Sequence, residues 1–164
     1  SVLTSDGKQV ERIKDIKWIA YGISSIPGTI QHLEFLQQME LEGNNLSILP
    51  AELKYLKRLK DLQIHDNNLI ALPEFIGNLD DLVSLDIHNN QLTELPLSIG
   101  SLSKLETLNI GNNKITSLPD TLCGLYENGL NINIECNELD ESNVPSCLFN
   151  ELGSQGDPPN CSGN

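Results

Sequence analysis

The chain has 164 residues, a formal net charge of −13 and a pI near 4.4. This charge argues against non-specific binding to nucleic acid, which depends on cationic contacts with phosphate, and against binding to anionic membrane surfaces. No stretch of the sequence approaches the apolar length that a bilayer-spanning segment needs, so we expect no membrane insertion.

Residues 1–12 predict a short hairpin that precedes the main body of the chain. Val2-Leu3 and Gln9-Val10 flank the segment Thr4-Ser5-Asp6-Gly7-Lys8. Small, polar and glycine residues between two short strand-forming pairs are typical of a hairpin turn. We therefore expect residues 1–12 to form an N-terminal cap.

A 23-residue period begins near Ile13 and continues to about residue 148. It is clearest where leucines, an asparagine and a Leu-Pro pair recur in four successive blocks, at 36–50, 59–73, 82–96 and 105–119. The first of these blocks contains Leu36, Met39, Leu41, Asn44, Leu46, Leu49 and Pro50. Weaker blocks flank them: Tyr21 replaces the asparagine upstream, and the last block runs one residue late, with Glu127-Asn128-Gly129 absorbing the insertion.

This pattern is the L-x-x-L-x-L-x-x-N-x-L signature of leucine-rich repeats, so the chain resembles that family over residues 13–148. The resemblance implies an α/β solenoid with a curved parallel sheet of about six strands and short helical or 3₁₀ segments on the convex side. Each L-x-L segment alternates as a strand does, and the apolar pair after each Leu-Pro suits a short helical turn that starts at the proline. The first and last repeats are degenerate, because a terminal repeat must be closed against water.

An asparagine follows the predicted strand in five repeats, at Asn44, Asn67, Asn90, Asn113 and Asn137. The chain must turn there, and a buried asparagine can satisfy backbone donors and acceptors that no strand partner reaches. We therefore assign this column a structural role and leave it out of the candidate binding residues.

All four cysteines lie near the C-terminus, at Cys123, Cys136, Cys147 and Cys161. An even number of cysteines beside the last repeat resembles the disulfide caps of extracellular leucine-rich repeat proteins. Of the three possible pairings, we favour Cys123–Cys147, which would join neighbouring layers, and Cys136–Cys161, which would tie down a C-terminal cap or tail over 149–164. Two alternatives stay open: a zinc site, although the sequence has no C-x₂-C pair, and four reduced thiols in a cytosolic protein.

In this family the open sheet face usually binds the ligand, so we take the outward-facing columns of the strands as candidates. These columns carry acids and amides and few large apolar side chains, of which Ile19 is the main one. Tight obligate interfaces usually bury aromatic anchors, so this face suits a basic protein patch, a polar glycan or a cation. The candidate ligand-binding residues are Gln38, Glu40, Glu42, Asp61, Gln63, His65, Asp66, Asp86, His88 and Asn109.

His65 and His88 occupy equivalent places on adjacent predicted strands, about 5 Å apart, with Glu42, Asp66 and Asp86 close by. Two imidazoles and a carboxylate could hold a divalent metal. Two neighbouring surface histidines are more often ordinary polar surface, so we predict no metal site here.

The sequence contains no G-x-S-x-G, no phosphate-binding glycine loop and no H-E-x-x-H, which indicates a non-catalytic protein without a cofactor. We predict a secreted or cell-surface module that binds a protein partner with a basic patch through its acidic concave face. A glycan ligand is the first alternative. The chain could instead be a structural spacer of a larger surface protein, or a cytoplasmic scaffold, because the Leu-Pro repeats also resemble intracellular Ras-group leucine-rich repeats.

Overall fold

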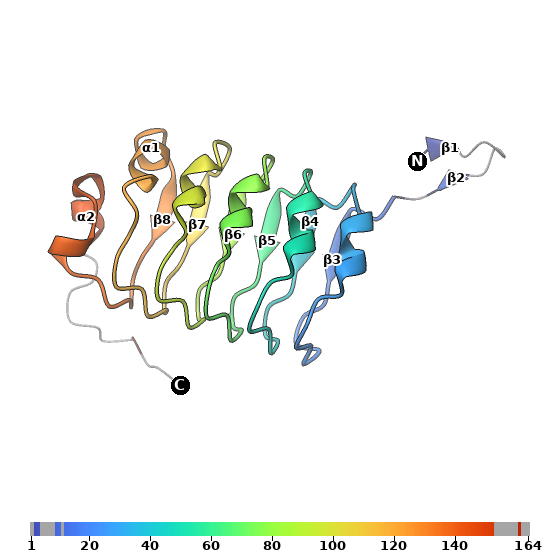
Figure 1. Cartoon of the computed structure of the whole chain (residues 1–164), viewed down its shortest axis with the longest axis horizontal. Coiled ribbons are helices and arrows are strands. Elements are labelled where there is room, and N and C mark those ends of the chain that lie inside the picture. Colours follow the sequence, from blue (N-terminus) through green and yellow to red (C-terminus); the bar gives the residue numbers. More distant parts are fainter. Residues whose placement is uncertain (1, 4–8, 11, 153–160, 162–164) are drawn as a thin grey trace.

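A computed structural model describes residues 2–3, 9–10, 12–152 and 161. Six short parallel strands lie side by side in one sheet, and their order in the sheet follows their order in the chain (Figure 1). They are β3 (Asp15–Lys17), β4 (Gln38–Glu40), β5 (Asp61–Gln63), β6 (Ser84–Asp86), β7 (Thr107–Asn109) and β8 (Asn131–Asn133). The predicted solenoid with about six strands is confirmed.

The strand register repeats the sequence period. Met39 of β4 pairs with Ile16 of β3 and with Leu62 of β5, each of which lies one repeat length away in the chain. The final step is longer by a single residue, since Leu108 pairs with Ile132. The extra residue is accommodated after α1 (Leu122–Glu127), where Gly129 adopts a φ of 97° that favours glycine, so the predicted insertion in this turn is confirmed.

Short helical segments lie along one side of the sheet and return the chain to the next strand (Figure 1). The first four are 3₁₀ helices: η1 (Gly28–His32), η2 (Ala51–Tyr55), η3 (Glu74–Asn78) and η4 (Leu97–Ser101). We predicted that each helical segment starts at the proline of its Leu-Pro pair. In the structure, this proline is the residue before the helix and has an extended conformation. At η2, for example, the carbonyl of Pro50 accepts a 3.1 Å hydrogen bond from the N–H of Leu53.

The core is a continuous stack of leucine and isoleucine layers, closed along one edge by the asparagine column. Asn67 donates from Nδ2 to the carbonyls of Leu41 and Ile64, at 2.9 and 3.1 Å, and its Oδ1 accepts from the N–H of Leu46 at 3.0 Å. Each of these asparagines bonds to its own repeat and to the one before it. This confirms their structural role.

At the N-terminal end of the solenoid, Tyr21 stands where the asparagine would be and is 74% exposed. Ile13 and Ile19 of the same repeat are exposed as well. Before this end, β1 (Val2–Leu3) pairs antiparallel with β2 (Gln9–Val10). In Figure 1 this hairpin extends away from the first repeat. The turn predicted over residues 4–8 lies outside the described residues.

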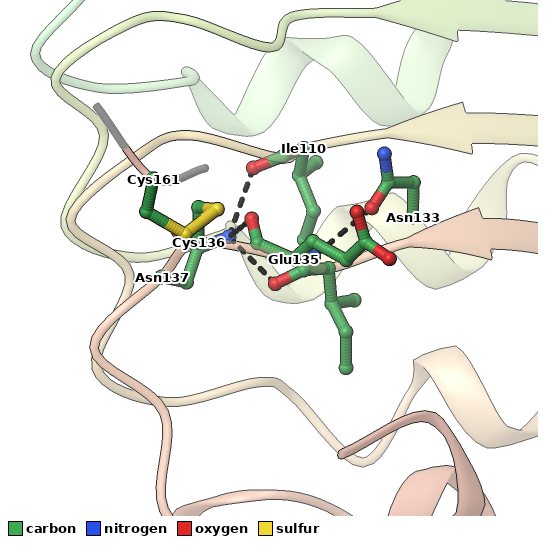
Figure 2. Close-up of a disulfide and its surroundings, with 7 residues drawn as sticks. Ile110, Asn133, Glu135, Cys136, Asn137 and Cys161 are labelled. Atoms are coloured by element: carbon green, nitrogen blue, oxygen red, sulfur yellow. Dashed lines mark hydrogen bonds between the residues drawn. A yellow bond between two sulfur atoms is a disulfide. The ribbon is translucent and has the colours of Figure 1, made fainter. Parts of the chain in front are cut away.

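At the C-terminal end, both predicted disulfides are present. Cys123 of α1 is bonded to Cys147 of η6 (Ser146–Leu148), and Cys136 is bonded to Cys161. Figure 2 shows the second bridge beside Asn137, the last member of the asparagine column. The elements η5 (Glu141–Asn143) and α2 (Phe149–Leu152) complete this end. All four cysteines are paired, so neither a zinc site nor reduced thiols describe this structure.

Within the described ranges, no helix is both long and apolar enough to cross a bilayer.

Candidate functional site

The strand register aligns the candidate residues in rows across the concave face of the sheet. Glu40, Gln63, Asp86 and Asn109 form one row on β4 to β7, each paired with the next. Gln38 and Asp61 pair in a second row. Glu42, His65 and His88 follow the strands, and Asp66 is the residue after His65. Gln38 and Asp66 are exposed and the other eight candidates are half-buried, so all ten remain accessible to a ligand.

The charge on this face is almost entirely negative. Its outward columns on β3 to β8 contain one lysine, Lys17, and carboxylates at Asp15, Glu40, Glu42, Asp61, Asp66, Asp86 and Glu135. Lys17 forms an ion pair with Glu40, with 2.6 Å between Nζ and Oε1. That hydrogen bond is the main cause of a raised pKa for Lys17.

One carboxylate on the face is incompletely satisfied. Oε2 of Glu42 is shielded from solvent and has no hydrogen-bond partner among the described residues. A shielded polar atom without a partner is unfavourable unless a ligand or water completes it.

The charge is distributed unevenly along the chain. Residues 1–60 contain eight of the ten Lys and Arg residues and seven of the 23 acids, a net charge of +1. Residues 61–164 contain the other two basic residues and 16 acids, a net charge of −14. The excess of acidic over basic residues therefore lies in the part of the chain from β5 onwards.

The two histidines on the face stack on each other. Their ring centroids lie 4.4 Å apart, and the ring planes are inclined by 17°. Nδ1 of His65 lies 2.7 Å from Oδ2 of Asp66, and Nδ1 of His88 lies 2.6 Å from Oδ1 of Asp86. The predicted proximity of Asp66 and Asp86 to the imidazoles is therefore observed.

Both aspartates are held from a second side by an amide. Nδ2 of Asn89 donates to Oδ1 of Asp66 at 2.7 Å, and Nδ2 of Asn109 donates to Oδ2 of Asp86 at 3.2 Å. Desolvation acts to raise the pKa of Asp66, but the hydrogen bonds from Asn89 and His65 outweigh it and the pKa is lowered. Asn89 was not among the candidates, although it shares a column with Asp66.

That column has a backbone signature. Ala20, Gly43, Asp66, Asn89, Asn112 and Cys136 all adopt a positive φ, between 50° and 68°. This left-handed region suits glycine, asparagine and aspartate. The preference explains why Asp66 and Asn89 occur here, and it is a signal that the sequence does offer.

Beside this column lies a groove of about 730 Å³ that the sequence reasoning missed. Its walls are mainly amides, with the Cys136–Cys161 bridge at one end. The lining residues include Asn68, Asn89, Gln91, Asn112 and Lys114. Gln91 donates to Asn68, its equivalent in the preceding repeat, at 3.4 Å.

A second feature missed by the sequence reasoning is a basic column outside the sheet face. The guanidinium carbons of Arg12 and Arg58 lie 3.5 and 4.7 Å from the centroid of the Phe35 ring. Successive members of this column are one repeat length apart in the chain, so the repeat period could have identified it.

Comparison with known proteins agrees with this architecture. A family model described as "Leucine Rich repeats (2 copies)" matches residues 80–124. A leucine-rich repeat protein of Leptospira interrogans is 34% identical, with a TM-score of 0.76, over 83% of this chain and 34% of its own length. This chain thus spans about a third of that protein. Comparison with curated protein sequences gives no match.

Two Arabidopsis thaliana structures share the fold. The leucine-rich repeat ectodomain of the receptor kinase SOBIR1 is 21% identical, with a TM-score of 0.74, over 88% of this chain and 81% of that one. A chain of the BIR3–SERK2 complex is 23% identical, with a TM-score of 0.69, over 85% and 76%. At this identity the likeness concerns the fold alone.

The repeat signature, the register and these comparisons define a leucine-rich repeat solenoid, a class whose curved sheet commonly forms an extended binding surface for other proteins. Within that class, this chain has 23-residue Leu-Pro repeats and a C-terminal end closed by two disulfides.

Proposed function

We propose that this chain is a non-catalytic, extracellular binding module whose concave face engages the basic patch of a protein partner. The observation that carries this proposal is the set of carboxylates on that face, of which only Glu40 is paired with a lysine among the described residues. Complementary charge steers association and selects partners. The shielded, unpartnered oxygen of Glu42 adds a local acceptor that a cationic side chain of the partner would complete.

The two disulfides support an extracellular location, because disulfides persist mainly in oxidising compartments. They also disfavour the cytoplasmic scaffold. The similarity in fold to receptor ectodomains agrees with a surface or secreted role. Large aromatic anchors are scarce on the described part of the concave face, which favours a charge-directed interaction over a tight apolar one.

The test compares two variants in which three acidic residues are replaced by lysine, one on the concave face and one outside it. Purified secreted and cell-surface proteins with basic patches are screened against the chain by surface plasmon resonance. For each protein that binds, the variant Glu40→Lys/Glu42→Lys/Asp86→Lys should lower affinity by roughly tenfold or more and flatten its dependence on salt concentration.

The control variant Glu94→Lys/Glu106→Lys/Glu127→Lys makes the same change in net charge at exposed positions outside the sheet face. It should retain most of the affinity. Equal losses in both variants would reduce the effect to net charge, and unchanged binding in both would move the interface away from the concave face.

A second candidate function is glycan binding, favoured by the amide-lined groove beside Asp66. Amides supply both donors and acceptors for sugar hydroxyls. A glycan array probed with wild type and with Asn68→Ala/Gln91→Ala would test it. A glycan that binds both proteins equally would not occupy this groove, and a structural spacer would bind neither glycans nor proteins.

A further inference from the structure

The histidine pair on the concave face has a defined protonation pattern in its neutral form. An ionised carboxylate can only accept a hydrogen bond. Nδ1 of His65 and Nδ1 of His88 contact carboxylates at 2.7 and 2.6 Å. Nδ1 of His88 also lies 3.2 Å from Nδ2 of Asn109, an amide that donates to Asp86. The shorter contacts with the carboxylates place the proton of each neutral ring on Nδ1. Both Nε2 atoms therefore keep a free lone pair.

This is the arrangement that orients metal-binding histidines in proteins. A ligating imidazole usually donates its other ring N–H to a carboxylate or carbonyl, which fixes the tautomer and makes the ring a better ligand. Here the supporting carboxylates are themselves fixed, Asp66 by Asn89 at 2.7 Å and Asp86 by Asn109 at 3.2 Å. Each of the two stacked rings therefore has its own supporting carboxylate.

The rings are also close enough to share one ion. One ligand atom from each of His65, Asp66 and His88 lies within 4.8 Å of the other two. Zn–N bonds are about 2.0–2.1 Å long, so two nitrogens that bind one ion lie no more than about 4.2 Å apart. Because the two rings are inclined by only 17°, they must tilt towards each other to point at one ion. The imidazoles are 23% and 26% exposed at an open surface, which leaves room for that rotation.

We propose that His65 and His88 form a bis-imidazole site for a divalent transition metal of the zinc, nickel or copper type. Imidazole ligands favour these ions over calcium and magnesium, which prefer oxygen ligands. Asp66 and Asp86 orient the rings and balance the charge of the ion. The remaining coordination positions face solvent on the concave side.

The site can be tested without the proposed protein partner, because zinc binding requires only groups from β5, β6 and β7 and the turns that follow β5 and β6. It also revises our expectation from the sequence, which placed two histidines together but gave no tautomer and no supporting hydrogen bonds.

Isothermal titration of the tag-free, disulfide-bonded chain with ZnCl₂ tests the proposal. The chain contains a third histidine, His32 of η1, which is exposed and lies outside the sheet face, so His32→Ala is a matched control. Wild type and His32→Ala should bind one zinc ion per chain with equal affinity. His65→Ala and His88→Ala should each bind roughly tenfold or more weakly, and Asp86→Asn should weaken binding by about tenfold.

A second readout counts the ligands. The electron paramagnetic resonance spectrum of the Cu²⁺-loaded chain should show coupling to two imidazole nitrogens in wild type and to one in either single variant. Circular dichroism melts confirm that each variant is folded. The proposal is overturned if wild type binds no zinc below millimolar concentrations, if all variants bind equally, or if His32→Ala is the variant that loses the ion.

Discussion

The four regular repeats and the two ends of this solenoid are built differently. In the middle, Asn44, Asn67, Asn90 and Asn113 are buried and link each repeat to the one before it through hydrogen bonds, with no covalent cross-link between the repeats. At the N-terminal end, the position equivalent to these asparagines is occupied by Tyr21, which is exposed to solvent. At the C-terminal end, the column finishes at the half-buried Asn137 and two disulfides add covalent links.

The difference follows from the one-dimensional nature of repeat proteins. An inner repeat buries both of its faces against neighbours, whereas a terminal repeat has one neighbour and needs another source of stability. The C-terminal end obtains it from covalent bonds. The first repeat instead exposes Ile13, Ile19 and Tyr21, so we expect the N-terminal end to be the less stable one.

The largest effect is expected from removing an inner asparagine. Asn67→Ala leaves the buried N–H of Leu46 without its acceptor. It also removes one of the two asparagine donors from the carbonyls of Leu41 and Ile64, which keep those from Asn44 and Asn90. We expect the free energy of unfolding, measured by urea denaturation, to fall by about 3–5 kcal/mol.

Asn137→Ala is the matched variant at the end of the column. Asn137 is itself half-buried, so water can enter the space that its side chain leaves, and the loss should be about half as large. Equal losses at the two positions would contradict the distinction between the middle and the end.

Removal of a disulfide should weaken the C-terminal end selectively. Cys123→Ser/Cys147→Ser opens a link between residues 24 positions apart, and the chain-entropy treatment gives a loss of about 3 kcal/mol. In hydrogen-exchange measurements, amides of α1 and β8 should lose protection while those of β4 and β5 keep it. Uniform loss along the whole chain would show that the solenoid unfolds as a single unit.

A smaller gain in stability is expected at the N-terminal end. Ala20 adopts a φ of 55°, where the equivalent residue of the next repeat is Gly43. Ala20→Gly should relieve the left-handed strain and raise the free energy of unfolding by about 1 kcal/mol. Ala51→Gly, in η2, is the control and should lower stability. A decrease with Ala20→Gly would mean that the turn tolerates the alanine side chain without strain.

The sequence predicted the parts of the fold that depend on periodicity. Apolar positions that recur once in every repeat determine the strand register, and the single-residue delay before Ile132 located the insertion correctly. The cysteine pairing followed from resemblance to known caps. The helix type was left open, because an i, i+3 apolar pair such as Leu53 and Leu56 suits both a 3₁₀ and an α turn.

The candidate site was only partly predictable. Alternation along the strands placed His65 next to His88, but the stacking of the rings and the choice of nitrogen depend on side-chain torsions that a single sequence does not specify. Other missed contacts were within reach. Lys57–Asp80, Asp81–Lys104 and Asp66–Asn89 all join residues one repeat length apart, so applying the same step to every column would have predicted them.

The difference between the two ends also predicts which end of the solenoid unfolds first under tension. Each disulfide joins residues about one repeat apart, 24 and 25 positions along the chain. While a disulfide is oxidised, tension cannot extend the segment between its two cysteines. At the other end, β3 is joined to the rest of the sheet through β4 alone. A chain stretched from its two termini would therefore unwind from the N-terminal repeat first, and reduction of the disulfides would increase the length that the pull releases.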